Sequence, residues 1–385
     1  MRTYACRETR DDMRIAFVYD IPYPWHKGGI EQIFSHESRE LAKAGLDVHF
    51  FTLRWKGMLH RFSCQNVEYH ALGRAYEHTV YRHGRRSIRE ALFFALRSLE
   101  LFGYSFNAVI TDAFPILHLP IVRAYCRLRG CRLIIRVDEV WNKKYWSEYL
   151  GIFGFIASAY SNAALICKNA TYVTASEEIA ARLEALGIQK RHIRIFAPII
   201  DGEEIRSAIA ANKRQRGSVK RVIFAGRLIK EKRLDKWLGI VRKAADIDNG
   251  IKALIIGEGV ERQKAKALIR RLRLSGRVEL RPFYKDKAKL YREIIRSRAV
   301  LHTSEREGLG IIVLESLALG TPVVLSESSP IPNSIKRMCS IGNEKSMPSL
   351  LLKAMKGRRR RIRRDLDTFS SSGVVRFYRN IGVIR

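Results

Sequence analysis

Short apolar runs alternate with amphipathic helical stretches along most of the sequence, and the alternation begins again near residue 220. An apolar run of four to seven residues between breakers is typical of a strand buried on both faces, as in a parallel sheet. The predicted strands span residues 15–19, 48–53, 107–111, 132–137, 171–174 and 193–196, and then 220–225, 252–256, 278–280, 299–302 and 322–325. The helices predicted between them span residues 30–44, 88–102, 115–128 and 176–186, and then 232–245, 260–274, 285–296 and 311–319. The sequence therefore predicts an α/β chain with two doubly wound parallel-sheet domains.

A chain of 385 residues has room for two such domains, and the polar stretch 201–218 marks the approach to the second. We predict an N-terminal domain over residues 14–197, a C-terminal domain over 198–345, and a basic helical tail over 346–385. In open α/β sheets, ligands bind at the carboxyl ends of the strands. Two such domains that face each other therefore predict a site in the cleft between them.

The loop after the strand at 299–302 leads through glycines into a helix that opens near Gly310. Glycines let a ligand approach the backbone, and the free N–H groups of a helix start favour an anion such as a diphosphate. Glu307 lies at that opening, where its carboxylate can accept hydrogen bonds from hydroxyls. Glu315 follows eight residues later, about two helical turns deeper. A helix with an acidic first turn and one exposed glutamate explains these residues equally well.

Two other loops lie on the predicted ligand edges. Arg227 and Lys232 follow a strand in the second half, and two cations there can clamp a phosphate, although a chain with 71 Lys and Arg offers many such pairs. Gly28 and Gly29 follow the first strand and permit close approach of a ligand to the backbone. Neither this pair nor the glycines at 257–259 complete the GxGxxG fingerprint, which disfavours a nicotinamide-linked oxidoreductase.

The ordered motifs resemble one enzyme family. Glu307 and Glu315 form an E-x7-E pattern, and GRLIKEK at 226–232, GGIEQ at 28–32 and LALGTPVV at 317–324 accompany it. The set resembles the family-4 (group 1) glycosyltransferases of the GT-B fold, over residues 14–324. The resemblance implies two Rossmann-like domains that face each other across a cleft, and a closing helix that packs back toward the N-terminal domain. It also implies retaining transfer of a hexosyl unit from a UDP- or GDP-sugar to a lipid-linked or oligosaccharide acceptor, in cell-envelope polysaccharide or glycoprotein glycan synthesis.

The resemblance also implies roles for individual residues. By the family's pattern, Glu307 would contact the donor-sugar hydroxyls and Glu315 would contact the nucleoside ribose. Arg227 and Lys232 would hold the diphosphate. The phosphates and the sugar would lie against the backbone at Gly28, Gly29, Leu309 and Gly310. Fixed cations and a helix start can stabilise the leaving diphosphate, so the family implies neither a cofactor nor a metal. The DxD triplets at 246–248 and 365–367 do not follow strands, and we interpret both as surface acids.

One position departs from the family. Asp138 stands at or beside the place where many members carry a histidine, directly after the strand at 132–137. Its carboxylate either accepts a hydrogen bond from an acceptor or sugar hydroxyl, or stabilises positive charge at the reacting sugar, or simply caps a loop. Glu139 is a weaker candidate for the same role. We interpret His118 as a packing residue.

The charge of the chain points to a polyanionic partner. It carries 71 Lys and Arg against 38 Asp and Glu, a net charge of +33, with most of the excess in the second half. Such a surface is typical of proteins that bind nucleic acid, anionic lipid or phosphorylated substrates. Basic and aromatic residues at 54–97, and the basic stretch at 353–364, favour an anionic membrane surface, although solvated loops and helices fit them equally well.

Two alternative functions have less support in the sequence. A nucleic-acid-binding α/β protein is supported by the charge alone, without a recognition-helix or RNP signature, so nucleic acid is disfavoured as a partner. An epimerase or phosphorylase of related GT-B fold stays open. The six cysteines form no CxxC pair and the first twelve residues lack an apolar core, which predicts a cytoplasmic protein. The family resemblance, together with the basic stretches, implies that it is peripheral at the inner face of the cell membrane. The uncharged stretch 149–167 is close to a membrane span in length, but its polar residues favour a buried core helix or an interfacial segment.

Overall fold

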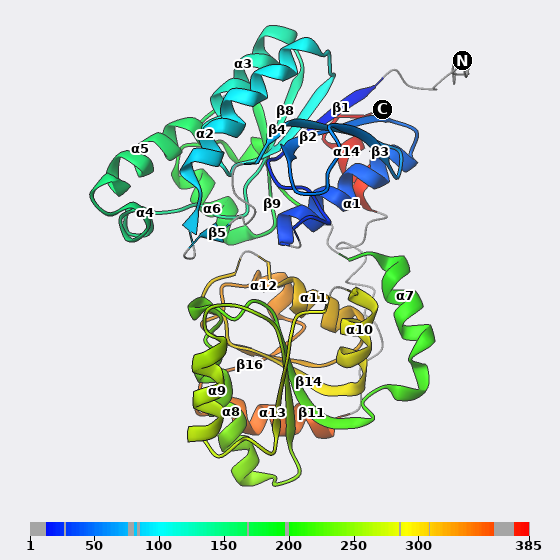
Figure 1. The fold of residues 1–385 in the computed structure, drawn as a ribbon, viewed down its shortest axis with the longest axis vertical. Coiled ribbons are helices and arrows are strands. Elements are labelled where there is room, and N and C mark those ends of the chain that lie inside the picture. The colour runs from blue at the N-terminus through cyan, green and yellow to red at the C-terminus, as the bar shows by residue number, and fades with distance from the viewer. Residues whose placement is uncertain are drawn as a thin grey trace. The chain divides into compact units, whose positions relative to one another are not determined.

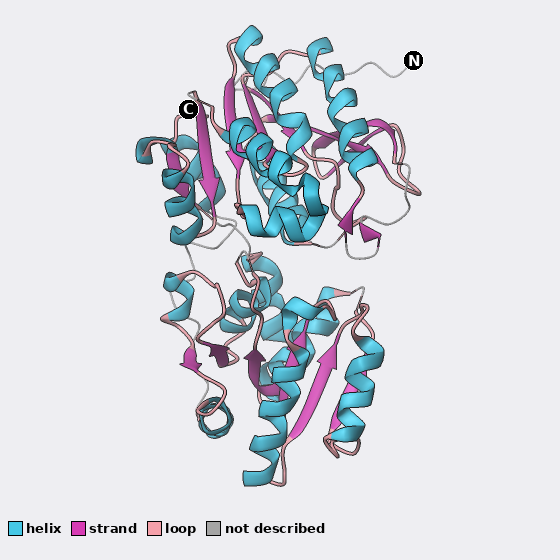
Figure 2. Ribbon diagram, turned by 90° about the vertical axis from the view of Figure 1, so that its left-hand side faces the viewer, coloured by secondary structure: helices cyan, strands magenta, loops and turns pink. Residues whose placement is uncertain are grey.

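The computed structural model describes residues 13–26, 28–75, 81–82, 85–167, 169–196, 200–284, 286–307, 309–357 and 373–384. The chain divides into two compact units. Unit 1 comprises Met1–Ile199 and Ser371–Arg385, and unit 2 comprises Ile200–Ser370. In each unit helices pack around a largely parallel sheet (Figures 1 and 2), which confirms the predicted α/β class with two Rossmann-like sheets.

The sheet of unit 1 has eight strands in the order β10-β9-β8-β7-β1-β2-β4-β3. All neighbouring strands are parallel except β3 and β4, which form an antiparallel pair at one edge. The strands are β1 (Arg14–Val18), β2 (Asp47–Arg54), β3 (Arg61–Cys64), β4 (Val67–Arg74), β7 (Ala108–Asp112), β8 (Arg132–Arg136), β9 (Ala170–Thr174) and β10 (Ile193–Ile195), with a separate pair β5 (Tyr81–Arg82) and β6 (Arg85–Arg86). The six strands predicted for this half are confirmed to within two residues at each end. The β3–β4 pair was missed because β4 mixes polar and apolar residues instead of forming an apolar run.

The helices of unit 1 connect these strands and end with a segment that returns after unit 2. They are α1 (Gly29–Lys43), α2 (Ile88–Arg97), α3 (Leu119–Arg129), α4 (Lys143–Leu150), α5 (Gly154–Leu165), α6 (Glu177–Ala185) and α14 (Val374–Asn380), with 3-10 turns η1 (Ser98–Gly103), η2 (Ile116–His118), η3 (Gly151–Phe153) and η4 (Lys190–His192). In Figure 1, α14, drawn in red, lies beside α1, drawn in blue, and the two helices are in contact.

The uncharged stretch 149–167 does not form a core helix. It comprises the end of α4, the turn η3 and the helix α5, and Gly154 lets α5 pack closely on α4 because a Cβ there would collide with the backbone of Trp146. The large side chains in and after η3 are exposed to solvent. The buried-helix alternative is therefore wrong, since the large side chains of η3 and of the first turn of α5 are more than half exposed among the described residues. Among the described residues, no helix is both long enough and apolar enough to cross a membrane.

The sheet of unit 2 has six parallel strands in the order β13-β12-β11-β14-β15-β16. The strands are β11 (Val219–Ala225), β12 (Lys252–Ile256), β13 (Val278–Arg281), β14 (Ser297–His302), β15 (Val323–Ser326) and β16 (Ser340–Gly342). The helices are α7 (Gly202–Ala211), α8 (Leu234–Ile247), α9 (Arg262–Arg271), α10 (Lys287–Arg296), α11 (Ile311–Ala318), α12 (Asn333–Lys336) and α13 (Met347–Lys356), with 3-10 turns η5 (Lys213–Gln215) and η6 (Lys230–Lys232). The predicted boundary at residue 345 falls before α13, whose apolar side chains lie in the core of unit 2.

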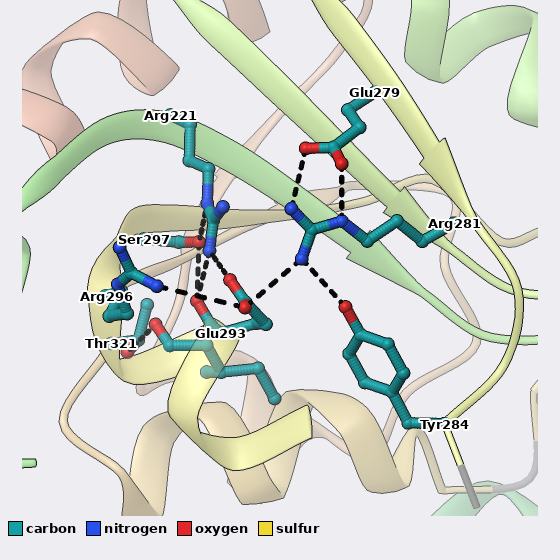
Figure 3. A network of polar contacts seen from close by, with 9 residues as sticks. Arg221, Glu279, Arg281, Tyr284, Glu293, Arg296, Ser297 and Thr321 are labelled. Atoms are coloured by element: carbon teal, nitrogen blue, oxygen red, sulfur yellow. Dashed lines mark hydrogen bonds and ion pairs between the residues drawn. The ribbon is translucent and has the colours of Figure 1, made fainter. Parts of the chain in front are cut away.

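A network of arginines fastens α10 to the sheet of unit 2 (Figure 3). Glu293 on α10 pairs with Arg221 of β11 and, at 3.2 Å, with Arg281 of β13. Arg281 also donates to the hydroxyl of Tyr284 at 2.9 Å. Burial alone would raise the pKa of Glu293, but Arg221 and Arg281 more than offset this and lower it. The charged carboxylate thus holds one helix against two strands, and the strand ends carry the loops of the site.

Candidate active site

The predicted donor-side residues of unit 2 lie in two loops at the carboxyl edge of its sheet. One loop follows β11 and leads through η6, and the other follows β14 and leads into α11. Because β11 and β14 are neighbours in the sheet, the two loops meet. The backbone N–H of Glu305 donates to the carbonyl of Glu231 at 2.9 Å, and the Thr303 hydroxyl donates to the carbonyl of Lys232 at 3.1 Å.

Lys232 and Glu307 form an ion pair between these loops. Both side chains are mostly buried, with 16% and 14% of their surface exposed. The ring Nε2 of His302, the last residue of β14, lies 3.2 Å from the same carboxylate oxygen. Burial alone would raise the pKa of Glu307, but Lys232 and His302 offset it and bring the pKa down to about 2. The site therefore holds a carboxylate that is charged at neutral pH, fixed beside a cation at a strand end.

His302 was missed by the sequence reasoning. It ends a predicted strand, and a polar residue at the carboxyl end of a buried strand lies on the ligand edge of an α/β sheet. Its other ring nitrogen, Nδ1, lies 3.4 Å from the hydroxyl oxygen of Ser329. That contact orients the ring toward Glu307.

Glu315 lies on α11 and contacts a different set of residues. Its carboxylate accepts a hydrogen bond from the Tyr291 hydroxyl at 2.8 Å and pairs with Lys287 at 2.9 Å, both on α10. Burial and the neighbouring carboxylate raise the pKa of Tyr291, so its hydroxyl stays a donor. Glu315 is thus held between α10 and α11, whereas Glu307 is held between the loops after β11 and β14.

Gly310 begins α11 with a left-handed backbone. Its φ is 69° and its ψ is 58°, and its carbonyl accepts the first helical hydrogen bonds from Val313 and Leu314, at 2.8 and 3.2 Å. A Cβ at this position would lie 2.6 Å from Cδ1 of Ile331. Leu309, just before it, is buried. The preceding residue of the loop, 308, lies outside the described residues.

We expect Gly310→Ala to lower the free energy of unfolding by about 1–3 kcal/mol, because the left-handed backbone is strained for alanine and Ile331 must move. Urea denaturation measures the change. Gly276→Ala is the matched control, since its Cβ would meet no atom within 4 Å and its backbone is ordinary. There alanine is expected to leave stability unchanged or raise it slightly. Equal loss in both variants would contradict the strain at Gly310.

Arg227 and the glycines at 226, 257 and 259 lie in the loops after β11 and β12. Arg227 is exposed in the loop after β11. The adjacent Leu228 N–H donates to the carbonyl of Glu258 at 2.7 Å, which joins this loop to the one after β12. A Cβ at Gly257 would collide with the carbonyl oxygen of Gly226. The glycines at 257–259 therefore serve the packing of two loops.

In unit 1, carboxylates follow three neighbouring strands at the carboxyl edge of the sheet. Asp20 follows β1, Asp112 ends β7 and Asp138 follows β8. Burial, and then the nearby Asp138, raise the pKa of Asp112 well above its usual value. Burial raises the pKa of Asp20 to about 6, although Arg86 pairs with it. Sequence reasoning singled out only Asp138; a polar residue at the end of each buried run is the signal that marks the other two.

Asp138 has one carboxylate oxygen with a hydrogen-bond partner and one without a partner among the described residues. Its Oδ2 accepts from Nε of Arg136 at 3.1 Å. Its Oδ1 is buried and has no hydrogen-bond partner among the described residues. A buried carboxylate oxygen in that state is suited to accept a hydrogen bond from a ligand. His118, by contrast, is fully buried beside Thr111, and burial lowers its pKa to about 4, which agrees with a packing role.

Gly28 and Gly29 lie where α1 begins, on the same edge of unit 1. Gly28 is the N-cap of α1 and Gly29 its first residue, and a Cβ at Gly28 would collide with the carboxylate of Glu31. Glu31 also accepts from the hydroxyl of Tyr19 at 3.4 Å. The helix start therefore lies against an acidic side chain of its own first turn.

Arg136 is the centre of a buried network behind Asp138. Its guanidinium donates to Oε1 of Glu37 on α1 and to the carbonyl of Phe196, each at 3.1 Å. Oε2 of Glu37 accepts from the hydroxyl of Tyr378 on α14 at 2.8 Å. The last helix of the chain is thereby linked, through α1 and β8, to the predicted site residue Asp138.

No three or more His, Cys, Asp or Glu side chains gather as metal ligands would within the described part of the chain. Asp246 pairs with Arg242, and Asp248 pairs with Lys220 at 2.9 Å. The second DxD triplet, at 365–367, lies outside the described residues.

Comparisons with known proteins cover most of the chain. The family model described as Glycosyltransferase Family 4 matches residues 27–204, and the model described as Glycosyl transferases group 1 matches residues 206–338. A search of curated proteins gave no match.

Among solved structures, sucrose-phosphate synthase from Thermosynechococcus elongatus is similar, with a TM-score of 0.72 and 14% identity over 96% of this chain and 99% of that one. HepE from Anabaena, in complex with UDP and glucose, has a TM-score of 0.66 and 14% identity over 97% and 100% of the two chains. The lipopolysaccharide outer core galactosyltransferase WaaB has a TM-score of 0.64 and 16% identity over 96% and 98%. At these identities the likeness shows a shared fold.

Proposed function

The chain belongs to the family-4, group 1 glycosyltransferases of the GT-B fold, and from this membership we propose that it moves a hexosyl unit from a UDP- or GDP-sugar to a lipid-linked or glycan acceptor with retention at the anomeric carbon. The observation that carries the proposal is the mostly buried pair of Lys232 and Glu307 at the carboxyl ends of two neighbouring strands. Similar structures were solved with UDP and glucose bound, which supports a nucleotide-sugar donor.

The proposed chemistry uses the residues that the structure brings together. In the reaction, the bond from the anomeric carbon to the diphosphate breaks, the acceptor oxygen bonds to that carbon, and the acceptor proton passes to the departing phosphate. Lys232, Arg227 and the start of α11 stabilise the charge that builds on the diphosphate. Glu307 accepts hydrogen bonds from donor-sugar hydroxyls. Glu315 binds the nucleoside ribose, and no cofactor or metal takes part in the proposed reaction.

Unit 1 supplies the acceptor side of the proposal. Asp138 presents a buried carboxylate oxygen that has no partner among the described residues, so it can accept a hydrogen bond from an acceptor hydroxyl. Burial and the nearby Asp138 raise the pKa of Asp112, so the protonated carboxyl is favoured there relative to an ordinary aspartate. The backbone at Gly28 and Gly29 lies against the phosphates and sugar in this proposal.

A donor panel tests the proposal directly. A bound donor is expected to stabilise the folded protein by about 2.7 kcal/mol at one hundred times its Kd, because it binds only the folded state. Thermal unfolding is measured with UDP-, GDP- and ADP-sugars and with each nucleoside diphosphate alone. We expect one nucleotide series to raise Tm and Lys232→Ala to reduce that rise. No rise with any donor would contradict the proposed function.

We also place the reaction at the cytoplasmic face of an anionic membrane, in cell-envelope polysaccharide or glycoprotein glycan synthesis. The net charge of +33 supports this placement, since a single diphosphate requires only a few of the 71 basic residues. The same charge remains the only observation in favour of the nucleic-acid-binding alternative. The basic stretch at 353–364 lies partly outside the described residues.

A further inference from the structure

We propose that α4, η3 and α5, together with the outer face of α2, form a surface that docks unit 1 on an anionic lipid bilayer. This docking surface consists of Ile88, Leu92, Leu96 and Leu99 on α2 and η1, and of Ile152, Phe153, Phe155 and Ile156 on η3 and α5. The inference rests on the proposed function only in assuming an acceptor at a membrane.

The hairpin of α4 and α5 carries its apolar side chains at the tip. Ile152 is 88% exposed, and Phe153, Phe155 and Ile156 are between 60% and 65% exposed. No charged residue occurs from 150 to 167. The two helices pack on each other at Gly154, so the tip projects as one element. Large apolar side chains gathered at an exposed tip mark an interaction site rather than ordinary surface scatter.

The face of α2 adds a second row of apolar side chains. Ile88, Leu92 and Leu96 follow one another at four-residue spacing, and each is more than half exposed. The opposite face of the helix packs into unit 1 through Phe94, which is fully buried. The sequence favoured a membrane contact through the basic and aromatic residues of 54–97, and of these aromatic side chains Trp55, Tyr69 and Phe94 are buried. The proposed docking surface therefore uses the exposed aliphatic row of α2 in place of these three buried aromatic side chains.

The two parts of the docking surface belong to one region of unit 1. Both α2 and α5 pack against η2. The backbone N–H of Arg86, just before α2, donates to the hydroxyl of Tyr149 near the end of α4 at 2.5 Å. Figure 1 shows α2, α4 and α5 at the same end of this unit.

On α2, η1 and α4 the exposed charged side chains are four basic ones (Arg89, Arg97, Lys143 and Lys144) and two acidic ones (Glu100 and Glu148), so the net positive charge favours anionic lipid as the partner. Nζ of Lys143 lies 4.8 Å from the centre of the Phe155 ring, and Lys144 beside it is exposed. Arg89 is exposed between Ile88 and Leu92. Apolar side chains with Lys and Arg beside them are the pattern of a surface that inserts its apolar residues below phosphate head groups.

The hairpin also connects to the acceptor-side carboxylates. Trp141 and Trp146 pack at 4.8 Å between ring centres at its base, and Phe114 packs on Trp141 at 5.2 Å. The indole N–H of Trp141 donates to Glu139 at 2.7 Å. Because Glu139 directly follows Asp138, docking of the tip would bring the head group of a lipid-linked acceptor near the proposed acceptor site.

Vesicle co-sedimentation tests the docking surface. The full chain is mixed with vesicles of equal parts phosphatidylglycerol and phosphatidylcholine, and with vesicles of phosphatidylcholine alone. We expect binding to the anionic vesicles that weakens with salt, and a loss of about tenfold or more in the partition coefficient for the double variant Ile152→Ser/Phe153→Ser. Leu59→Ser, which changes a 69% exposed leucine elsewhere in unit 1, is the matched control and is expected to bind within about twofold of the unmodified chain.

Three results would overturn the proposal. In the first two, the unmodified chain does not bind anionic vesicles, or the double variant binds them as well as the unmodified chain does. In the third, the unmodified chain self-associates in sedimentation and the double variant does not. The last result would assign the surface to a second copy of the chain. Donor hydrolysis in solution, without vesicles, is measured in parallel and is expected to be unchanged in the double variant. Donor hydrolysis without vesicle binding would reject the docking surface and leave the proposed function intact. Vesicle binding without donor turnover would support the docking surface and reject the proposed function.

Discussion

Lys232→Ala is expected to lower kcat/KM for glycosyl transfer by about two to three orders of magnitude, the usual effect of removing one preorganised group that stabilises a developing charge. The loss has two physical sources. Lys232 is a mostly buried cation in the donor-side loops, and together with His302 it keeps the Glu307 carboxylate charged against burial. Steady-state kinetics with the nucleotide sugar identified by the thermal panel measures the loss.

The partner variants sharpen this test. Glu307→Gln keeps the size of the side chain and removes its charge, and we expect a loss of similar order. Because the two groups act as a unit, the double variant should lose little more than the worse single variant. Glu305→Gln is the control, since Glu305 is exposed and pairs with Arg233 and Lys236. Its kcat/KM should stay within about twofold, and a Lys232→Ala variant no worse than this control would refute the site.

Arg136→Met is expected to lower the free energy of unfolding of unit 1 by about 3–5 kcal/mol, since it removes one partner of a buried ion pair and leaves the others uncompensated. Arg136 is 1% exposed and pairs with both Glu37 and Asp138. Burial raises the pKa of Glu37 to about 7 even with Arg136 and Tyr378 beside it. Without Arg136, its carboxylate would be buried with a tyrosine hydroxyl as its remaining partner.

Urea denaturation, followed through the transition of unit 1, measures this loss. Arg132→Met is the matched control, because Arg132 begins the same strand and is exposed. A change within about 0.5 kcal/mol is expected there. Tyr378→Phe removes one hydrogen bond to Glu37 and should cost about 1–2 kcal/mol. If Arg136→Met is as stable as the control, the network does not hold unit 1 together.

The sequence predicted the central strands of both sheets well because these strands are buried and form continuous apolar runs. The strands β3, β4 and β16 were missed because they are exposed or mix polar with apolar residues. The sequence also placed Lys232 and Glu307 in loops at strand ends. It could not show that these two side chains pair, because that follows from β11 and β14 being neighbours, which is a matter of topology. His302 was missed because it was assigned to the end of a predicted strand, and Asp112 was missed because it directly follows one.

Other features depend on contacts that no local pattern encodes. Glu37 meets Arg136 across 99 positions of sequence and Tyr378 across 341. The stretch 149–167 shows that composition alone cannot place a segment, because a stretch that faces a core and one that faces a bilayer are both apolar. The packing of Gly154 against α4 and the 88% exposure of Ile152 show that this tip is not part of a core.

The return of residues 371–385 to unit 1 has a consequence for the order of assembly during translation. Unit 2 is inserted between the sheet of unit 1 and the helix that closes it. At about 5–20 residues per second, synthesis of the 200–370 insertion takes roughly 10–35 s. Throughout that interval Glu37 and Arg136 lack Tyr378. Unit 2 is therefore fully synthesised before α14 can complete unit 1, so the order of synthesis lets unit 2 become stable first.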